Sequence, residues 1–158
     1  MFTSLTEEAS KKLEGILFDL LTMVEAEAIF LCDRGGNIIA SKSVSTYPHE
    51  DNIAALAAGS FFATLEIARL IGESEFQNVL HQGEHRSVFM ERTSKDMLLL
   101  VVFSRDSNPG LVKLHTRLAC QKLEEFDILV DQCGGQGVVS KSVTFEMDPQ
   151  ARPFKSNP

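Results

Sequence analysis

A chain of 158 residues, 44% of them hydrophobic, is long enough to bury a core of its own and too short for two full domains. Its formal net charge is −7 and it has no run of lysine or arginine, which argues against nucleic-acid binding because that binding depends on neutralising phosphates. No segment reaches the roughly 20 apolar residues of a membrane span and the N-terminus has no signal-peptide core, so we expect a cytoplasmic protein.

The first predicted element is a helix over residues 5–24. Ser4 and Glu7 have the spacing of a capping box, in which each side chain accepts a free N–H at the helix start. Apolar residues then recur at the spacing of one helical face. They are Leu5, Ala9, Leu13, Ile16, Leu17, Leu20, Leu21 and Val24.

A hairpin is predicted next. Ala28–Cys32 is an apolar run too short for a helix, and residues 38–42 form its partner strand after a turn at residues 33–37. The turn contains Gly35 and Gly36, which raises the alternative of a phosphate-binding loop. Such a loop needs its glycines between a strand and a helix, so we favour a simple turn and expect no bound nucleotide.

The second predicted helix follows a polar loop. Asp51 or Asn52 can cap its start, and it continues to about Ile71, where Gly72 closes it. Helical periodicity divides it into two faces. The face expected to cover the sheet contains Ile53, Ala57, Phe61, Thr64, Ala68 and Ile71. The face left uncovered contains Ala55, Gly59, Phe62, Glu66 and Arg69.

Three further strands are predicted at residues 76–82, 86–92 and 97–104. The last of them is apolar along most of its length, as is Ala28–Cys32, which indicates central strands covered on both faces. The strand 76–82 has no lysine or proline, so we expect it at an open edge where a second copy can pair with it. The residues expected at that edge are Phe76, Val79, Leu80 and Gln82.

A third helix is predicted from Pro109, with Asn108 as its cap, to just before Gly134. Its buried stripe is expected to contain Leu111, Leu114, Leu118, Ala119, Leu123, Phe126 and Val130. We therefore expect one domain over residues 1–133 and a flexible tail over residues 134–158, with room for a short strand at 138–145. The element order predicts an α/β (α+β) fold, a five-stranded antiparallel sheet with one helix on one face and two on the other.

Few residues have the spacing of a catalytic or metal site. His81 and His85 are four apart, but Gly83 between them indicates a hairpin turn and not a helix that would point both at one metal. Cys32 is interpreted as a small core residue, and three cysteines in all fit reduced thiols better than disulfides. We predict no catalytic residue, metal or cofactor, and a Cys-His nucleophile pair stays open as the alternative.

The uncovered face of the second helix is the main candidate for function. Small side chains such as Ala55 and Gly59 let another backbone approach, and Phe62 stands among them. Two interpretations stay open. Either Phe62 contacts a partner or a second copy of the chain, or it completes the core.

Several segments in a fixed order resemble a known family. They are FLCDRGGNIIA at 30–40, AAGSFFATLEIARLIGESEF at 57–76, HQGE at 81–84, LLLVVF at 98–103 and GLVKL at 110–114. Over about residues 5–130 the chain is similar to the roadblock / dynein light chain family and, within it, to the bacterial MglB proteins. The resemblance implies a homodimer whose sheets join edge to edge, with the second helices side by side on one face.

The resemblance also implies a function: a homodimeric GTPase-activating protein for a small Ras-like GTPase of the MglA type, in bacterial cell polarity or motility. Such a regulator remodels the GTPase and does not insert an arginine finger. The implied contact residues are Ala55, Gly59, Phe62 and Glu66, with Arg69 beside them. The alternatives are a scaffold that binds a GTPase or another roadblock protein without stimulating hydrolysis, and a thiol or metal enzyme on the same fold.

Overall fold

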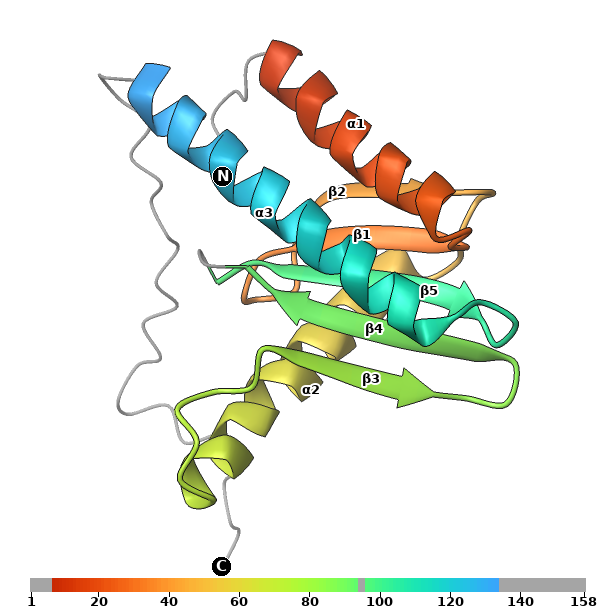
Figure 1. Ribbon diagram of the computed structural model, residues 1–158, viewed down its shortest axis with the longest axis vertical. Coiled ribbons are helices and arrows are strands. Elements are labelled where there is room, and N and C mark those ends of the chain that lie inside the picture. The colour runs from red at the N-terminus through yellow and green to blue at the C-terminus, as the bar shows by residue number, and fades with distance from the viewer. Residues whose placement is uncertain (1–6, 94–95, 134–158) are drawn as a thin grey trace, which may run out of the picture.

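The computed structural model describes residues 7–93 and 96–133, which form three helices and one five-stranded sheet (Figure 1). The strand order is β2-β1-β5-β4-β3, and every neighbouring pair is antiparallel. The elements are α1 (Glu7–Met23), β1 (Ala28–Cys32), β2 (Ile38–Ser43), α2 (Glu50–Leu70), β3 (Asn78–Gln82), β4 (Arg86–Arg92), β5 (Leu98–Ser104) and α3 (Pro109–Cys133). The predictions for Ser4, Leu5 and the segment 134–158 lie outside the described residues.

Helices cover both faces of the sheet, which confirms the predicted fold class. Figure 1 shows α1 and α3 side by side on one face and α2 across the other. Side chains alternate between the faces along each strand. Ile29 and Leu31 of β1 therefore pack in the cluster beneath α1 and α3, whereas Phe30 packs beneath α2 with Leu100 and Phe61.

β1 and β5 are central strands, as predicted. Every side chain of β1 is buried, and β5 is buried from Leu98 to Phe103. The strands are paired with Phe30 opposite Leu100. β2 and β3 are the two outer strands, and the pairing of β2 with β1 contains a β-bulge at Leu31 and Cys32.

The predicted cap of α2 is wrong, whereas its predicted end is confirmed. The residue before the helix is His49, in a left-handed conformation with φ 60° and with no side-chain cap hydrogen bond. Asp51 instead lies within the first turn, where the helix dipole stabilises a negative charge. At the other end Gly72 has φ 84°, and its N–H donates to the carbonyl of Arg69 at 3.2 Å. Glu73 donates to the carbonyl of Ala68, which completes a Schellman motif.

The predicted buried stripe of α3 is wrong in its first half, because Leu111, Leu114 and Leu118 are exposed. Ala119 and Leu123 are buried as predicted, and the other buried side chains are Val112, Thr116 and Cys120. Most of these are small, and the cluster beneath the helix contains the large rings of Phe89 and Phe103. Small helix residues over large strand residues fill the layer. Phe126 is half-buried, and the side chain of Val130 lies outside the described part of the chain.

One carboxylate is buried between α3 and the sheet. Glu91 of β4 is only 5% exposed, and its Oε1 lies 3.6 Å from Nε of Arg117. Within the described residues its Oε2 has no hydrogen-bond partner, and neither has Oγ1 of Thr116. Burial raises the pKa of Glu91, and the attraction of Arg117 and Lys113 opposes this without cancelling it. The folded chain therefore holds the Glu91 proton more tightly than the unfolded chain does.

This burial predicts a pH dependence of stability. The folded chain holds the Glu91 proton at a pH where the unfolded chain has released it, so the free energy of unfolding falls as pH rises from 4.5, the ordinary value, through the raised pKa. Glu91→Gln removes this loss, so the variant should gain stability relative to the wild type at pH 7 more than at pH 4. Thermal unfolding at both pH values measures it, with the exposed Glu125→Gln as control. An equal change at both pH values would contradict the prediction.

Candidate functional site

The inner face of α2 packs closely on the sheet through small residues. Ala54, Ala58, Phe61 and Ala68 are buried there. Phe61 and Ala68 were expected on this face, but Ile71 was too, and it is 66% exposed beyond the last turn. The helix therefore rests on the sheet mainly through alanines and Phe61, and the half-buried Ile53 and Ala57, both expected on this face, pack against the same cluster.

The turn between β1 and β2 is packed against the start of α2. A Cβ on Gly36 would lie 2.5 Å from the Cα of Ala55, and Gly36 has a φ of 81°. Both observations require glycine at this position. The glycines join two strands, as predicted, so the strand-to-helix geometry of a phosphate-binding loop is not present here.

The outer face of α2 is apolar and exposed. Leu56 is 75% exposed, and Ile67 and Leu70 also have more than half of their surface in solvent. These three, with Ala63, share one side of the helix, opposite the buried alanines. Sequence reasoning missed them because it placed them on neither of the two faces that it assigned to this helix. We call Leu56, Ala63, Ile67 and Leu70 the outer face.

The composition of α2 reflects this second apolar side. Among the described helices, α2 is the one long and apolar enough to cross a membrane, a test that the core helix of a soluble protein also passes. Only 22% of that window is buried inside the protomer. The expectation that no segment approaches the length and apolar content of a membrane span is therefore wrong for α2. Several large apolar side chains exposed on one side of a helix indicate a contact surface.

Most of the residues predicted to bind a partner flank the outer face. Ala55, Gly59, Glu66 and Arg69 are all exposed. Nε of Arg69 donates to Oε2 of Glu66 at 3.0 Å, and this hydrogen bond lowers the pKa of Glu66. A Cβ added to Gly59 would meet nothing within 4 Å. The protomer therefore has no steric need for glycine at this place.

Phe62 is half-buried, so one part of its ring contacts the core and another part stays exposed. Its ring packs against the α2-side core and meets the ring of Phe61 edge-on, with 5.5 Å between the centroids. The guanidinium carbon of Arg34, in the β1–β2 turn, lies 4.8 Å from the Phe62 centroid, as in a cation–π contact. Phe62 is thus held in place from both sides, and only part of its ring is available to a partner.

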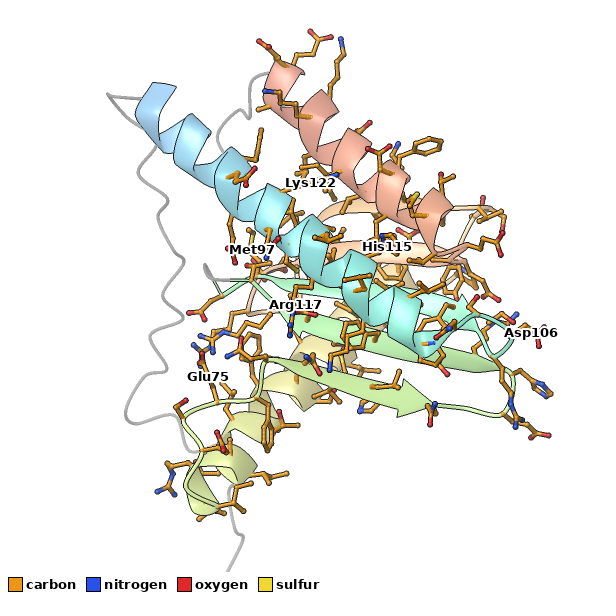
Figure 2. The ribbon with its side chains drawn as sticks, in the orientation of Figure 1. Glu75, Met97, Asp106, His115, Arg117 and Lys122 are labelled. Atoms are coloured by element: carbon orange, nitrogen blue, oxygen red, sulfur yellow. The ribbon has the colours of Figure 1, made fainter. Side chains whose placement is uncertain are left out.

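A chain of ion pairs connects Phe62 to the start of β3. Arg34, which stacks on Phe62, lies 3.6 Å from a carboxylate oxygen of Asp96. Asp96 also pairs with Arg92, and Arg92 pairs with Glu75 just before β3. Figure 2 shows Glu75 at the end of the sheet where α2 turns into β3. The contacts of Arg34 and Arg92 therefore connect the flank of α2 with the edge strand.

β3 is an outer strand, as predicted, but it is shorter than expected. It spans Asn78–Gln82, so Phe76 lies before the strand, half-buried, and does not belong to its edge. Val79 packs with the cluster beneath α2, whereas Leu80 lies on the opposite face and is exposed. Gln82 is exposed at the strand end.

Two backbone bonds show which groups of β3 face outward. The N–H of Arg92 donates to the carbonyl of Gln77, and the N–H of Gly83 donates to the carbonyl of Arg86. Hydrogen-bonded pairs alternate in an antiparallel ladder. Odd-numbered residues of β3 therefore bond to β4, and the backbone groups of Asn78, Leu80 and Gln82 point to the open edge.

The candidates for other chemistry are poorly placed. Cys32 is buried in β1, and burial, together with the adjacent Asp33, raises the pKa of its thiol to about 12. Cys120 is also buried with a raised pKa, so neither thiol favours the reactive thiolate. His81 ends up on β3 and His85 in the following turn, as the hairpin prediction required. Among the described side chains, those of residues 7–93 and 96–126, no three His, Cys, Asp or Glu residues form a group that could hold a metal ion.

A family model and solved structures match this chain. The Roadblock/LC7 domain model matches residues 4–103, which is more than half of the chain. The gliding protein MglB of Thermus thermophilus is 31% identical, with a TM-score of 0.72, over 77% of this chain and 93% of that one. Myxococcus xanthus MglB is 31% identical, with a TM-score of 0.69, over 72% and 93%. A structure described as MglB with tetrameric arrangement is 30% identical, with a TM-score of 0.73, over 77% and 92%.

Proposed function

The chain belongs to the Roadblock/LC7 domain family, and on that premise we propose that it is a homodimeric regulator of a small Ras-like GTPase of the MglA type. The proposal includes activation of GTP hydrolysis and a role in bacterial cell polarity or motility, in the cytoplasm. The observation that carries it is the outer face of α2, on which Leu56, Ile67 and Leu70 are exposed. A contact surface on an MglB-like fold, with no competing site chemistry in the described residues, supports a regulator that acts by binding.

The direct test is GTP hydrolysis by an MglA-type GTPase with this protein in excess, under single-turnover conditions. We expect stimulation of about tenfold or more, since GTPase activators raise turnover by up to about 10⁵. Binding without stimulation supports the alternative, a roadblock scaffold. Absence of binding would contradict the contact proposal itself.

Self-association is proposed to use the open edge of β3. Leu80 presents its N–H to that edge, whereas Val79 is bonded within the protomer by the alternation of the ladder. Leu80→Pro removes an outward donor and should shift the mass measured by light scattering from dimer to that of a 17.5 kDa monomer, with the circular dichroism spectrum retained.

Val79→Pro is the matched comparison, because it removes an inward donor and should damage the pairing of β3 with β4. If Leu80→Pro leaves the dimer intact, pairing does not use this edge.

Gly59 is proposed to leave room for a partner backbone. Glycine inside a helix is less stable than alanine by about 0.5–1 kcal/mol, and nothing in the protomer would touch an added Cβ. Gly59→Ala should therefore stabilise the chain in urea unfolding by about that amount, yet weaken GTPase binding about tenfold. Gly15→Ala in α1, where the added Cβ also meets nothing within 4 Å, is the control and should stabilise without affecting binding. Equal effects of the two variants on GTPase binding would show that Gly59 is not part of the contact.

A further inference from the structure

A second exposed apolar surface lies on α3, on the sheet face opposite α2. Leu111, Leu114 and Leu118 are 50%, 53% and 43% exposed. They follow one another at three and four residues, so they form one row about two turns long on the helix surface. The sheet-facing side of the helix is occupied by Val112, Thr116, Ala119 and Leu123, so the row points away from the core. We call these three leucines the α3 ridge.

Basic side chains border the α3 ridge on both sides. Figure 2 shows Arg117 on the β4 side of α3, where its Nε lies 3.6 Å from Glu91. Lys113 is on the same side, since it too acts on the charge of Glu91. His115 and Lys122 lie on the side toward α1 (Figure 2). Residues 107–123 contain no aspartate or glutamate, although the whole chain has a net charge of −7.

We propose that the α3 ridge binds an amphipathic helix of a partner protein that carries leucine-like residues in its centre and carboxylates on both margins. Apolar side chains of such a helix would cover Leu111, Leu114 and Leu118, and its carboxylates would meet Lys113 and Lys122 on the two sides. The site lies on the opposite face from α2 and does not depend on the GTPase role proposed there.

Charge disfavours the two other occupants of such a surface. A twofold contact between two copies of the ridge would bring the basic margins of both helices together, and like charges across an interface repel. An anionic lipid surface would meet α1 as well, because α1 lies beside α3 in the same layer (Figure 1). The described α1 has four acidic and two basic side chains, and Glu8, Glu14 and Asp19 are exposed. A single acidic helix needs to cover only the three leucines and the basic side chains beside them.

The test uses a synthetic helical peptide of about 18 residues with leucines on one face and glutamates on both margins. Its binding to the full-length protein is measured by fluorescence anisotropy. A peptide of the same composition in scrambled order is the control for simple charge attraction. We expect the designed peptide to bind at least tenfold more tightly than the scrambled one.

Two variants locate the binding. Leu114→Gln should weaken it about tenfold, and Lys113→Glu with Lys122→Glu should weaken it further. The matched controls are Phe18→Gln and Lys11→Glu with Lys12→Glu, which make the same kinds of change at exposed positions of α1 and should leave it unchanged. All four variants change exposed side chains, so their circular dichroism spectra should match the wild type.

Four binding results would overturn the proposal. They are no binding of the designed peptide, equal binding of the scrambled one, equal loss in the α1 controls, and tighter binding of vesicles of phosphatidylglycerol than of the peptide. Dissociation of a dimer by Leu114→Gln, measured by sedimentation, would assign the ridge to self-association and would overturn the proposal as well.

Discussion

Replacing Leu56 and Ile67 together with arginine will abolish binding of an MglA-type GTPase while leaving the protomer folded. Both side chains are more than half exposed on the outer face of α2, so arginine at these positions changes protomer stability by only about 0.5 kcal/mol each. In a contact, the same two changes put charges where apolar groups are desolvated. Hot-spot residues contribute about 2 kcal/mol or more, which corresponds to a loss of at least about 30-fold in affinity.

The matched control for this variant is Leu111→Arg with Leu118→Arg. These leucines are also about half exposed, and they lie on the opposite face of the sheet. Isothermal titration with the GTPase should show full affinity for the α3 variant and none for the α2 variant. If the two variants lose affinity equally, the contact does not use the outer face of α2. The α3 variant should in turn lose the acidic peptide, so the two proposals can fail separately.

Phe61→Ala will remove a large part of the stability of the protomer, whereas Phe62→Ala will remove much less. Phe61 is fully buried between α2 and the sheet, and truncating a buried phenylalanine to alanine costs about 3–5 kcal/mol. The free energy of unfolding of such a domain is about 5–15 kcal/mol in total. Phe62 is half-buried, so the expected cost is less than half of that for Phe61. Urea unfolding of the two variants measures the difference.

Binding measurements on the same pair add a second comparison. Phe62→Ala should weaken GTPase binding more than its cost in stability accounts for, because part of its ring is available to a partner. Equal destabilisation by the two substitutions would place Phe62 in the core and would leave no separate role for it in a contact.

The strands and their order were predictable because each has a simple pattern. Ala28–Cys32 and Arg86–Arg92 were predicted with the bounds that the structure has, and the all-apolar strands are central. A short apolar run between turn residues leaves few alternatives. Phe76 was placed in β3 although the strand begins at Asn78, which reflects the weaker signal of a half-polar outer strand.

The helices were harder, because α2 and α3 each have two apolar stripes. The inner face of α2 was predicted correctly apart from Ile71, whereas the first half of the α3 stripe was not. In both, small residues such as Ala58 and Ala119 face the sheet, and leucines such as Leu56 and Leu114 face outward. Periodicity shows that a stripe exists but does not show which of two stripes is buried. The choice depends on the strands beneath, whose large side chains, such as Phe30 and Phe103, favour small residues at most of the facing helix positions. That information lies far away in the sequence.

The contact predicted on α2 stays a prediction, whereas the outer position of β3 is confirmed. The sequence placed a contact on α2 and an open edge at β3. The stacking of Arg34 on Phe62 could not be foreseen, since it joins a turn and a helix that are separated by 28 positions in the chain. Leu56 and Ile67 could have been found by asking which large aliphatic residues remain once alanines have filled the inner face.

The two borders of the sheet differ in a way that limits how far assembly can proceed. β2 has Lys42 and pairs with β1 through a β-bulge, both of which discourage further strand addition, whereas β3 has neither. A chain with two receptive borders could add copies without end and form a fibre. With only one, the first twofold pairing consumes the available border, and growth stops at a closed particle.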